Sequence, residues 1–119
     1  MLRNYLNKKV KVKIDRSLGS VHPKHKNIIY PINYGYIENT VSGDGEEIDV
    51  YVLDKEDPVE EVECKIIAVI ERENDCEHKL VGVSNSCTKT FTIEEIKEKT
   101  YFQEQYFKSN IILADNKNK

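Results

Sequence analysis

The residues with the clearest chemical potential lie in the stretch YPINYGYIENTVSGDGEEIDVYVL, residues 30–53. Asp44, Glu46 and Asp49 follow one another closely there, and crowded carboxylates repel each other unless cations neutralise them. Mg²⁺ is the cation that usually joins protein carboxylates to phosphate oxygens. The spacing therefore predicts a metal site, provided that the turn at Gly45 folds the loop over the following strand, because strand alternation alone separates Glu46 from Asp49. The alternative is a solvent-exposed acidic edge.

A second acidic cluster lies in the segment ERENDCEHK, where Asp75 and Glu77 precede Lys79. Two carboxylate clusters suit a site with more than one metal ion, and a lysine beside them suits a phosphate group. His78 lies between Glu77 and Lys79 and is interpreted as a surface residue.

The net charge of −3 conceals an uneven distribution. Residues 1–30 contain eight Lys or Arg and one acid, a net charge of +7, so the remainder carries −10. Such a division is compatible with a basic arm for nucleic acid or a membrane surface, with two walls of one site, or with two solvated faces. A site that holds an anion on one wall and its metal ion on the other fits the acidic clusters, and nucleic acid is not the favoured partner.

The basic segment HPKHK, residues 22–26, offers two histidines at HxxH spacing. This spacing is a zinc-ligand pattern on a helix, but Pro23 disfavours the helix that would present both rings. Lys24, Lys26 and the two histidines can instead bring positive charge to a phosphate.

The composition indicates one domain, residues 1–119, in the cytoplasm. At 119 residues the chain can bury a core without disulfides, and it contains no apolar run long enough for a membrane span or a secretion signal. Three widely spaced cysteines without a CxxC pair are interpreted as reduced.

Strand patterns dominate the first two-thirds of the chain, and helix signals are confined to the last third. The predicted strands contain VKVKI, IIY, YGYI, IDVYVL, VECKIIAVI and KLVGVS. Capping-box spacing at Thr92 and Glu95, and again at Thr100 and Gln103, predicts two short helices or one broken helix over about 93–108. The order of elements predicts an α+β fold with a small, curved antiparallel sheet or barrel.

The motif YPINYGYI followed by DGEEIDV resembles the soluble, Mg²⁺-dependent family I inorganic pyrophosphatases, in which a YPxNYGYI strand precedes a D-x-D-x-x-D loop. The likeness continues more loosely through NDCEHKLVGV and YFQEQYFK. It implies an OB-like barrel of the pyrophosphatase type with one or two C-terminal helices, and hydrolysis of pyrophosphate by a water that Mg²⁺ activates. The family is often oligomeric, so the resemblance also implies a possible homo-oligomer.

The resemblance also implies roles for individual residues. It implies that the metal ligands are Asp44, Glu46, Asp49, Asp75 and Glu77. It implies catalytic roles for Asp49, Tyr34 and Lys79, and substrate binding by Arg16, Lys79, Tyr106 and Lys108.

The chain departs from the family pattern in several places. Glutamate replaces the usual aspartate at Glu46 and Glu77, Glu47 stands where proline is usual, and Phe107 separates Tyr106 from Lys108. The chain is also short and lacks a hairpin ahead of YPINYGYI. We therefore expect weak activity, and the alternative is a non-catalytic or altered-substrate module that binds phosphate or nucleotide on the same fold.

Overall fold

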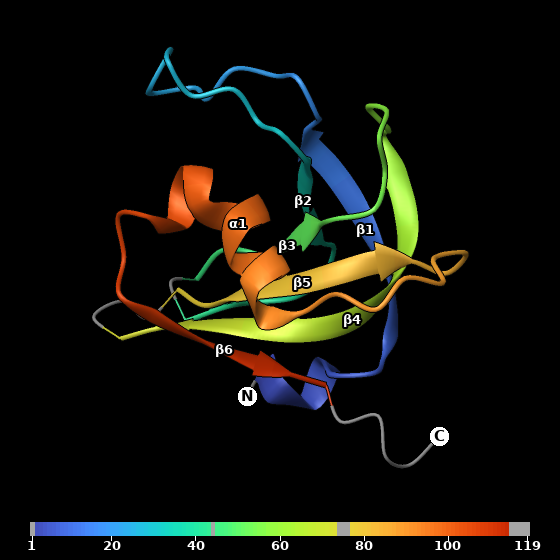
Figure 1. Cartoon of the computed structure of the whole chain (residues 1–119). Helices are drawn as coiled ribbons and strands as arrows, with labels where there is room; N and C mark the ends of the chain where they lie inside the picture. The colour runs from blue at the N-terminus through green and yellow to red at the C-terminus, as the bar shows by residue number, and fades with distance from the viewer. Residues whose placement is uncertain (1, 44, 74–76, 115–119) are drawn as a thin grey trace.

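The structure is a computed structural model that describes residues 2–43, 45–73 and 77–114 (Figure 1). The elements in chain order are a 3-10 helix η1 (Leu2–Tyr5), β1 (Lys9–Arg16), β2 (Asn33–Ile37), β3 (Ile48–Val52), β4 (Glu61–Arg72), β5 (Lys79–Ser84), α1 (Ile93–Glu104) and β6 (Ser109–Leu113).

Five strands close into a barrel in the order β1-β2-β3-β5-β4, because β1 also pairs with β4. Closure pairs both edges of the sheet, which leaves these strands no free edge for aggregation. This confirms the predicted small barrel, with one difference: β3 and β5 run parallel, whereas the other neighbours are antiparallel. β6 adds to β4 outside the ring.

The barrel interior is apolar and draws on all five strands. On β3, Ile48, Val50 and Val52 belong to this interior cluster, whereas Tyr51 belongs to a second cluster on the other face. The alternation predicted for this strand is therefore confirmed. Asp49 shares the face of Tyr51, and that face carries the site.

The second cluster lies under α1, which covers one side of the barrel (Figure 1). Thr92 caps the helix, and its hydroxyl and the Glu95 side chain form both bonds of the predicted capping box. Ile96, Thr100 and Glu104 are buried at four-residue intervals, so they face the barrel. The second predicted cap was wrong, because the Thr100 hydroxyl donates to the Ile96 carbonyl inside one continuous helix that ends at Glu104.

Gly35 explains why the tyrosine motif contains a glycine. It lies opposite Ile14 in the β1–β2 ladder. A Cβ atom at this position would lie 1.9 Å from the Lys13 carbonyl oxygen, so no larger residue fits without moving the β1 backbone.

Two segments differ from the sequence-based expectations. The IIY segment forms no strand; Ile29 makes only an isolated bridge to Val21, and residues 18–30 form an arm beside the barrel (Figure 1). The strand β6 was not predicted, because its short, half-buried sequence SNIIL lacks clear alternation.

Cys64 and Cys87 are free thiols, and Cys76 lies outside the described residues. None of the helices in the described ranges combines the length and apolar content needed to cross a bilayer.

Candidate active site

A cleft of about 930 Å³ opens beside the C-terminal end of α1. Residues from the end of β1, the arm, β2, β3, β4, β5 and the turn after α1 line it. Charges of both signs meet there. The lining residues used below include Arg16, Tyr34, Asp49, Arg72, Glu77 and Lys79.

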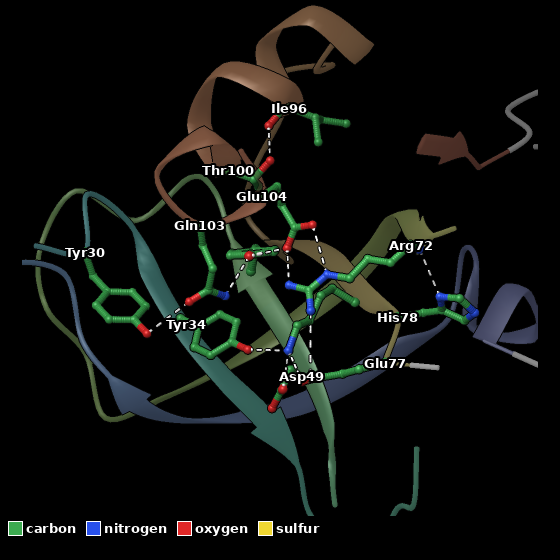
Figure 2. Close-up of polar contacts among 12 residues, drawn as sticks. Tyr30, Tyr34, Asp49, Arg72, Glu77, His78, Ile96, Thr100, Gln103 and Glu104 are labelled. Carbon is green, nitrogen blue, oxygen red and sulfur yellow. Dashed lines mark hydrogen bonds and ion pairs between the residues drawn. The ribbon is translucent and has the colours of Figure 1, made fainter. Parts of the chain in front are cut away.

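Lys79 is the central cation of the cleft, and its side chain is only 3% exposed. Its Nζ donates to the Tyr34 hydroxyl oxygen at 2.7 Å, to Asp49 Oδ2 at 2.6 Å and to Glu77 Oε2 (Figure 2). An ammonium group has three protons, so these bonds engage all of its donors. Lys79 therefore orients two carboxylates and a tyrosine, and it can bond a substrate oxygen only by releasing one of these partners.

Strand register brings these side chains together. Val50 pairs with Leu80 across the parallel β3–β5 ladder, so the preceding residues, Asp49 and Lys79, lie side by side on the outer face of the barrel. Tyr34 reaches the same face from β2, opposite Tyr51 of β3. The consecutive strands β2 and β3 and the more distant β5 thus contribute one side chain each.

Burial governs the protonation of the groups around Lys79. Burial raises the pKa of Glu77 above its ordinary value, although the bond from Lys79 opposes this shift. Burial also raises the pKa of Tyr34 well above 10, and the Asp49 carboxylate adds to the rise. Tyr34 therefore keeps its proton at neutral pH and can act as a hydrogen-bond donor.

Arg72 is a cleft residue that sequence reasoning missed. The β4–β5 register shifts between Ile66 and Ala68, which marks a β-bulge. Before the bulge, Cys64 and Ile66 face the barrel interior; after it, Val69 faces inward and Ile70 outward. The extra residue reverses the alternation, so Arg72 points into the cleft rather than into the barrel.

Arg72 makes a two-point ion pair with Glu104 of α1 (Figure 2). Its Nε and Nη2 donate to the two carboxylate oxygens at 3.1 and 2.7 Å. Its Nη1 lies 3.7 Å from Glu77 Oε1, and the guanidinium carbon lies 3.6 Å from the centre of the Phe107 ring. The backbone N–H of Arg72 donates to His78 Nδ1, so His78 has a structural bond that the sequence did not indicate.

A hydrogen-bonded chain links this ion pair to the arm side of the cleft. Tyr51 donates to Glu104 at 2.6 Å and accepts from Gln103 at 2.8 Å. The Gln103 amide oxygen in turn accepts from the Tyr30 hydroxyl at 3.3 Å. The sequence held one signal for this chain: Glu104 continues the four-residue spacing of Ile96 and Thr100, which places a carboxylate on the buried helix face.

The predicted metal ligands fall into two groups. Glu46, Asp49 and Glu77 all line the cleft. Asp44 and Asp75 lie outside the described residues. Within the described ranges, no three His, Cys, Asp or Glu side chains are grouped closely enough to hold a metal ion by themselves.

The donor chemistry nevertheless fits a hard divalent cation. Mg²⁺ is usually bound by one or two carboxylates together with substrate phosphates and water, and Asp49 and Glu46 offer carboxylate oxygens in one cleft. The described residues thus offer part of the ligand set that such a cation needs.

The predicted substrate-binding residues divide as well. Arg16 and Tyr106 line the cleft, and Arg16 also donates to the Asp15 carbonyl. Lys108 is not among the lining residues; its side chain is 77% exposed, and its Nζ lies 3.9 Å from Glu73. A role for Lys108 in substrate binding stays a prediction.

The arm brings His22, Lys24 and His25 to the cleft wall. The two imidazole rings lie 4.9 Å apart, and His22 stacks parallel to Tyr30 at 6.0 Å. Burial and the neighbouring His25 lower the pKa of His22 below its ordinary value. The arm therefore adds hydrogen-bond donors and the positive charge of Lys24 to the cleft that the carboxylates also line.

The barrel with one flanking helix thus carries a cleft in which carboxylates meet lysine, arginine and tyrosine, a set of side chains that suits phosphate groups and a divalent cation. Residues 5–119 match the family model described as inorganic pyrophosphatase, so the chain belongs to the inorganic pyrophosphatase family.

Curated relatives support this assignment. An inorganic pyrophosphatase of Campylobacter jejuni is 35% identical in an alignment of 85 residues that covers 65% of this chain and 49% of that protein. Another, from Mycoplasma genitalium, is 30% identical in an alignment of 99 residues that covers 77% of this chain and 54% of that protein. The chain thus spans about half the length of the curated relatives that it matches.

The fold resembles that of solved pyrophosphatases. The crystal structure of inorganic pyrophosphatase from Ehrlichia chaffeensis superposes with a TM-score of 0.70 at 19% identity, covering 92% of this chain and 88% of that one. A structure from Neisseria gonorrhoeae has a TM-score of 0.63 at 22% identity, covering 89% and 81%. At these identities the likeness concerns the fold.

Proposed function

We propose that the protein hydrolyses inorganic pyrophosphate to two phosphates with the help of Mg²⁺. The observation that carries the proposal is the bonding of Lys79 to Tyr34, Asp49 and Glu77 in one cleft of a family barrel. The cleft holds cations for phosphate oxygens and carboxylates for a divalent cation. Family membership favours this activity over the non-catalytic alternative.

The basic side chains of the cleft would bind the substrate. Arg16 and Lys24 line the same cleft as the carboxylates, and a guanidinium can bond two phosphate oxygens at once. Lys79 would exchange one of its present partners for a phosphate oxygen. Tyr34, which keeps its proton, would donate to the phosphate and hold it in register with the attacking water.

Carboxylates would hold the divalent cation. Glu46, Asp49 and Glu77 are the described members of the predicted ligand set, and Lys79 bonds both Asp49 and Glu77. Asp44 and Asp75, the other two, lie outside the described residues. When bound, the cation neutralises phosphate charge and makes water a stronger nucleophile. Asp49 also accepts a hydrogen bond from Lys79 and so keeps this lysine oriented. It would therefore act both on the cation and on the lysine that binds phosphate.

We propose a cytoplasmic location, consistent with the free Cys64 and Cys87, and pyrophosphate as the small-molecule partner. A homo-oligomer stays a prediction, which light scattering of the purified chain can decide.

Phosphate release from pyrophosphate tests the function. We expect Mg²⁺-dependent release by the purified chain and a loss of about a hundredfold or more in Asp49→Asn, because a misplaced or absent ligand disrupts the reacting geometry. Glu61→Gln is the matched control, since Glu61 pairs with Lys13 on the outer wall and does not line the cleft. Release at the uncatalysed rate in the presence of Mg²⁺ would exclude the enzyme and leave the phosphate-binding module.

A further inference from the structure

Arg72 introduces a second buried cation among the carboxylates of the cleft. Its side chain is 3% exposed, and it lies between Glu104 and Glu77. Neither the family resemblance nor the predicted ligand set assigns it a role. Its position depends on the β4 bulge, which is a device that often re-aims a side chain beside an active site.

Glu77 consequently faces one cation on each of its oxygens. Arg72 Nη1 lies 3.7 Å from Oε1, and Lys79 Nζ donates to Oε2. Two positive side chains therefore compensate a carboxylate that was predicted to need a metal ion for the same purpose. Asp49 is about as exposed as Glu77, with 25% against 26% of the side chain accessible, and it forms its ion pair with Lys79.

The Arg72 charge is fixed in place and in protonation state. The two bonds to Glu104 and the contact with the Phe107 ring hold the guanidinium in place. A guanidinium stays protonated at any pH at which the protein is folded. A divalent cation that approached Glu77 would therefore be repelled by the Arg72 guanidinium, which stays in place and stays protonated.

We propose that Arg72 is a positioning residue that supplies a permanent counter-charge to Glu77 and so weakens divalent-cation binding on this side of the cleft. The inference rests on the proposed function, because it concerns the metal that this function uses. Like charges repel strongly in a partly desolvated site, so the cation is directed toward Asp49 and Glu46. Glu77 is held in the cleft before any metal binds.

Equilibrium binding of Mn²⁺, followed by the electron paramagnetic resonance of the free ion without pyrophosphate, tests this role. Removal of Arg72 alone would strand the buried Glu104, so the informative protein is Arg72→Gln with Glu104→Gln, compared with Glu104→Gln alone. We expect about tenfold tighter Mn²⁺ binding in the double variant, the change that a modest electrostatic relief produces. The gain should disappear when Glu77→Gln is added.

Two controls separate this effect from general charge and from folding. Lys11→Gln removes one positive charge from an exposed site on β1 and should leave Mn²⁺ affinity unchanged. Arg72→Lys keeps the charge and should bind Mn²⁺ as the wild type does. If the double variant does not fold by circular dichroism, Arg72→Lys still decides, because tighter binding by this charge-preserving protein would overturn the proposal.

Equal Mn²⁺ affinity in the double variant and in Glu104→Gln would overturn the proposal, as would a gain that persists with Glu77→Gln. Binding is measured without substrate, so these outcomes are distinguishable from failure of the proposed function, which the phosphate-release assay of the wild type reports. Absence of Mn²⁺ binding in every protein would also overturn the role of Arg72.

Discussion

Two regions of the molecule use the same ion-pair chemistry in opposite surroundings. On the outer wall of the β1–β4 ladder, Glu61 lies 3.2 Å from Lys13 and 3.8 Å from Lys11, and all three side chains are 38–54% exposed. In the cleft, Arg72 and Glu104 pair at 2.7 Å with side chains 3% and 8% exposed. Both regions pair a basic side chain with a glutamate, but the side chains differ in burial.

Burial decides what each pair can do. Exposed pairs are screened by water and salt and contribute about 0–1 kcal/mol to stability. Loss of one member of a buried pair leaves an uncompensated charge, which costs about 3–5 kcal/mol. Of the two regions, the cleft is therefore the one in which ion pairing can hold reacting groups in place.

Glu104→Ala is the strongest test of this contrast. Arg72 would lose both bonds to the carboxylate, and the Tyr51 hydroxyl would lose its acceptor, so the free energy of unfolding should fall by about 3–5 kcal/mol. Urea unfolding measures the change. Arg72→Met combined with Glu104→Leu removes both charges and should cost less than Glu104→Ala; a cost as large or larger would show that shape rather than unpaired charge dominates here.

Alkaline pH gives a second, smaller effect in the cleft network. Burial, with a contribution from the Glu104 carboxylate, raises the pKa of Tyr51 well above 10. The folded phenol thus keeps its proton at a pH where the unfolded chain loses it, so this stabilisation is complete below about pH 10 and declines above it. The decline for one tyrosine is at most about 1.4 kcal/mol per pH unit.

Urea unfolding at pH 8 and pH 10.5 measures that decline, and Tyr51→Phe is the matched variant. The variant should lose less stability between the two pH values than the wild type. Tyrosinate absorbance should also show that Tyr51 ionises only on unfolding; ionisation of every tyrosine in the folded protein near pH 10 would contradict the assignment.

Glu61→Gln should have the smallest effect. Both of its partners remain solvated after the substitution, so we expect a change of about 0–1 kcal/mol that vanishes in high salt. Thermal or urea unfolding in low and high salt checks this. A salt-independent loss of several kcal/mol would mean that the outer wall, and not only the cleft, depends on its ion pairs.

Much of the barrel could be predicted from local patterns. Ile48, Val50 and Val52 alternate with Asp49 and Tyr51, and this alternation alone separates the interior from the site face. Thr92 and Glu95 mark the helix start through a local bond. The placement of Lys79 and Asp49 in one site was predicted only through the motif resemblance, and their direct contact was not predicted, because the two residues belong to strands that become neighbours in the folded sheet.

The sequence by itself determined the two faces of β3 and the start of the helix, because short-range periodicity and capping act between residues close in the chain. Only the tertiary structure decided that Arg72 faces the cleft and that Glu104 meets it. A bulge changes the direction of every later side chain in its strand, and its position depends on the β4–β5 register. The charge balance at Glu77 therefore depends on how the strands and the helix pack, because packing places Arg72 between Glu77 and Glu104.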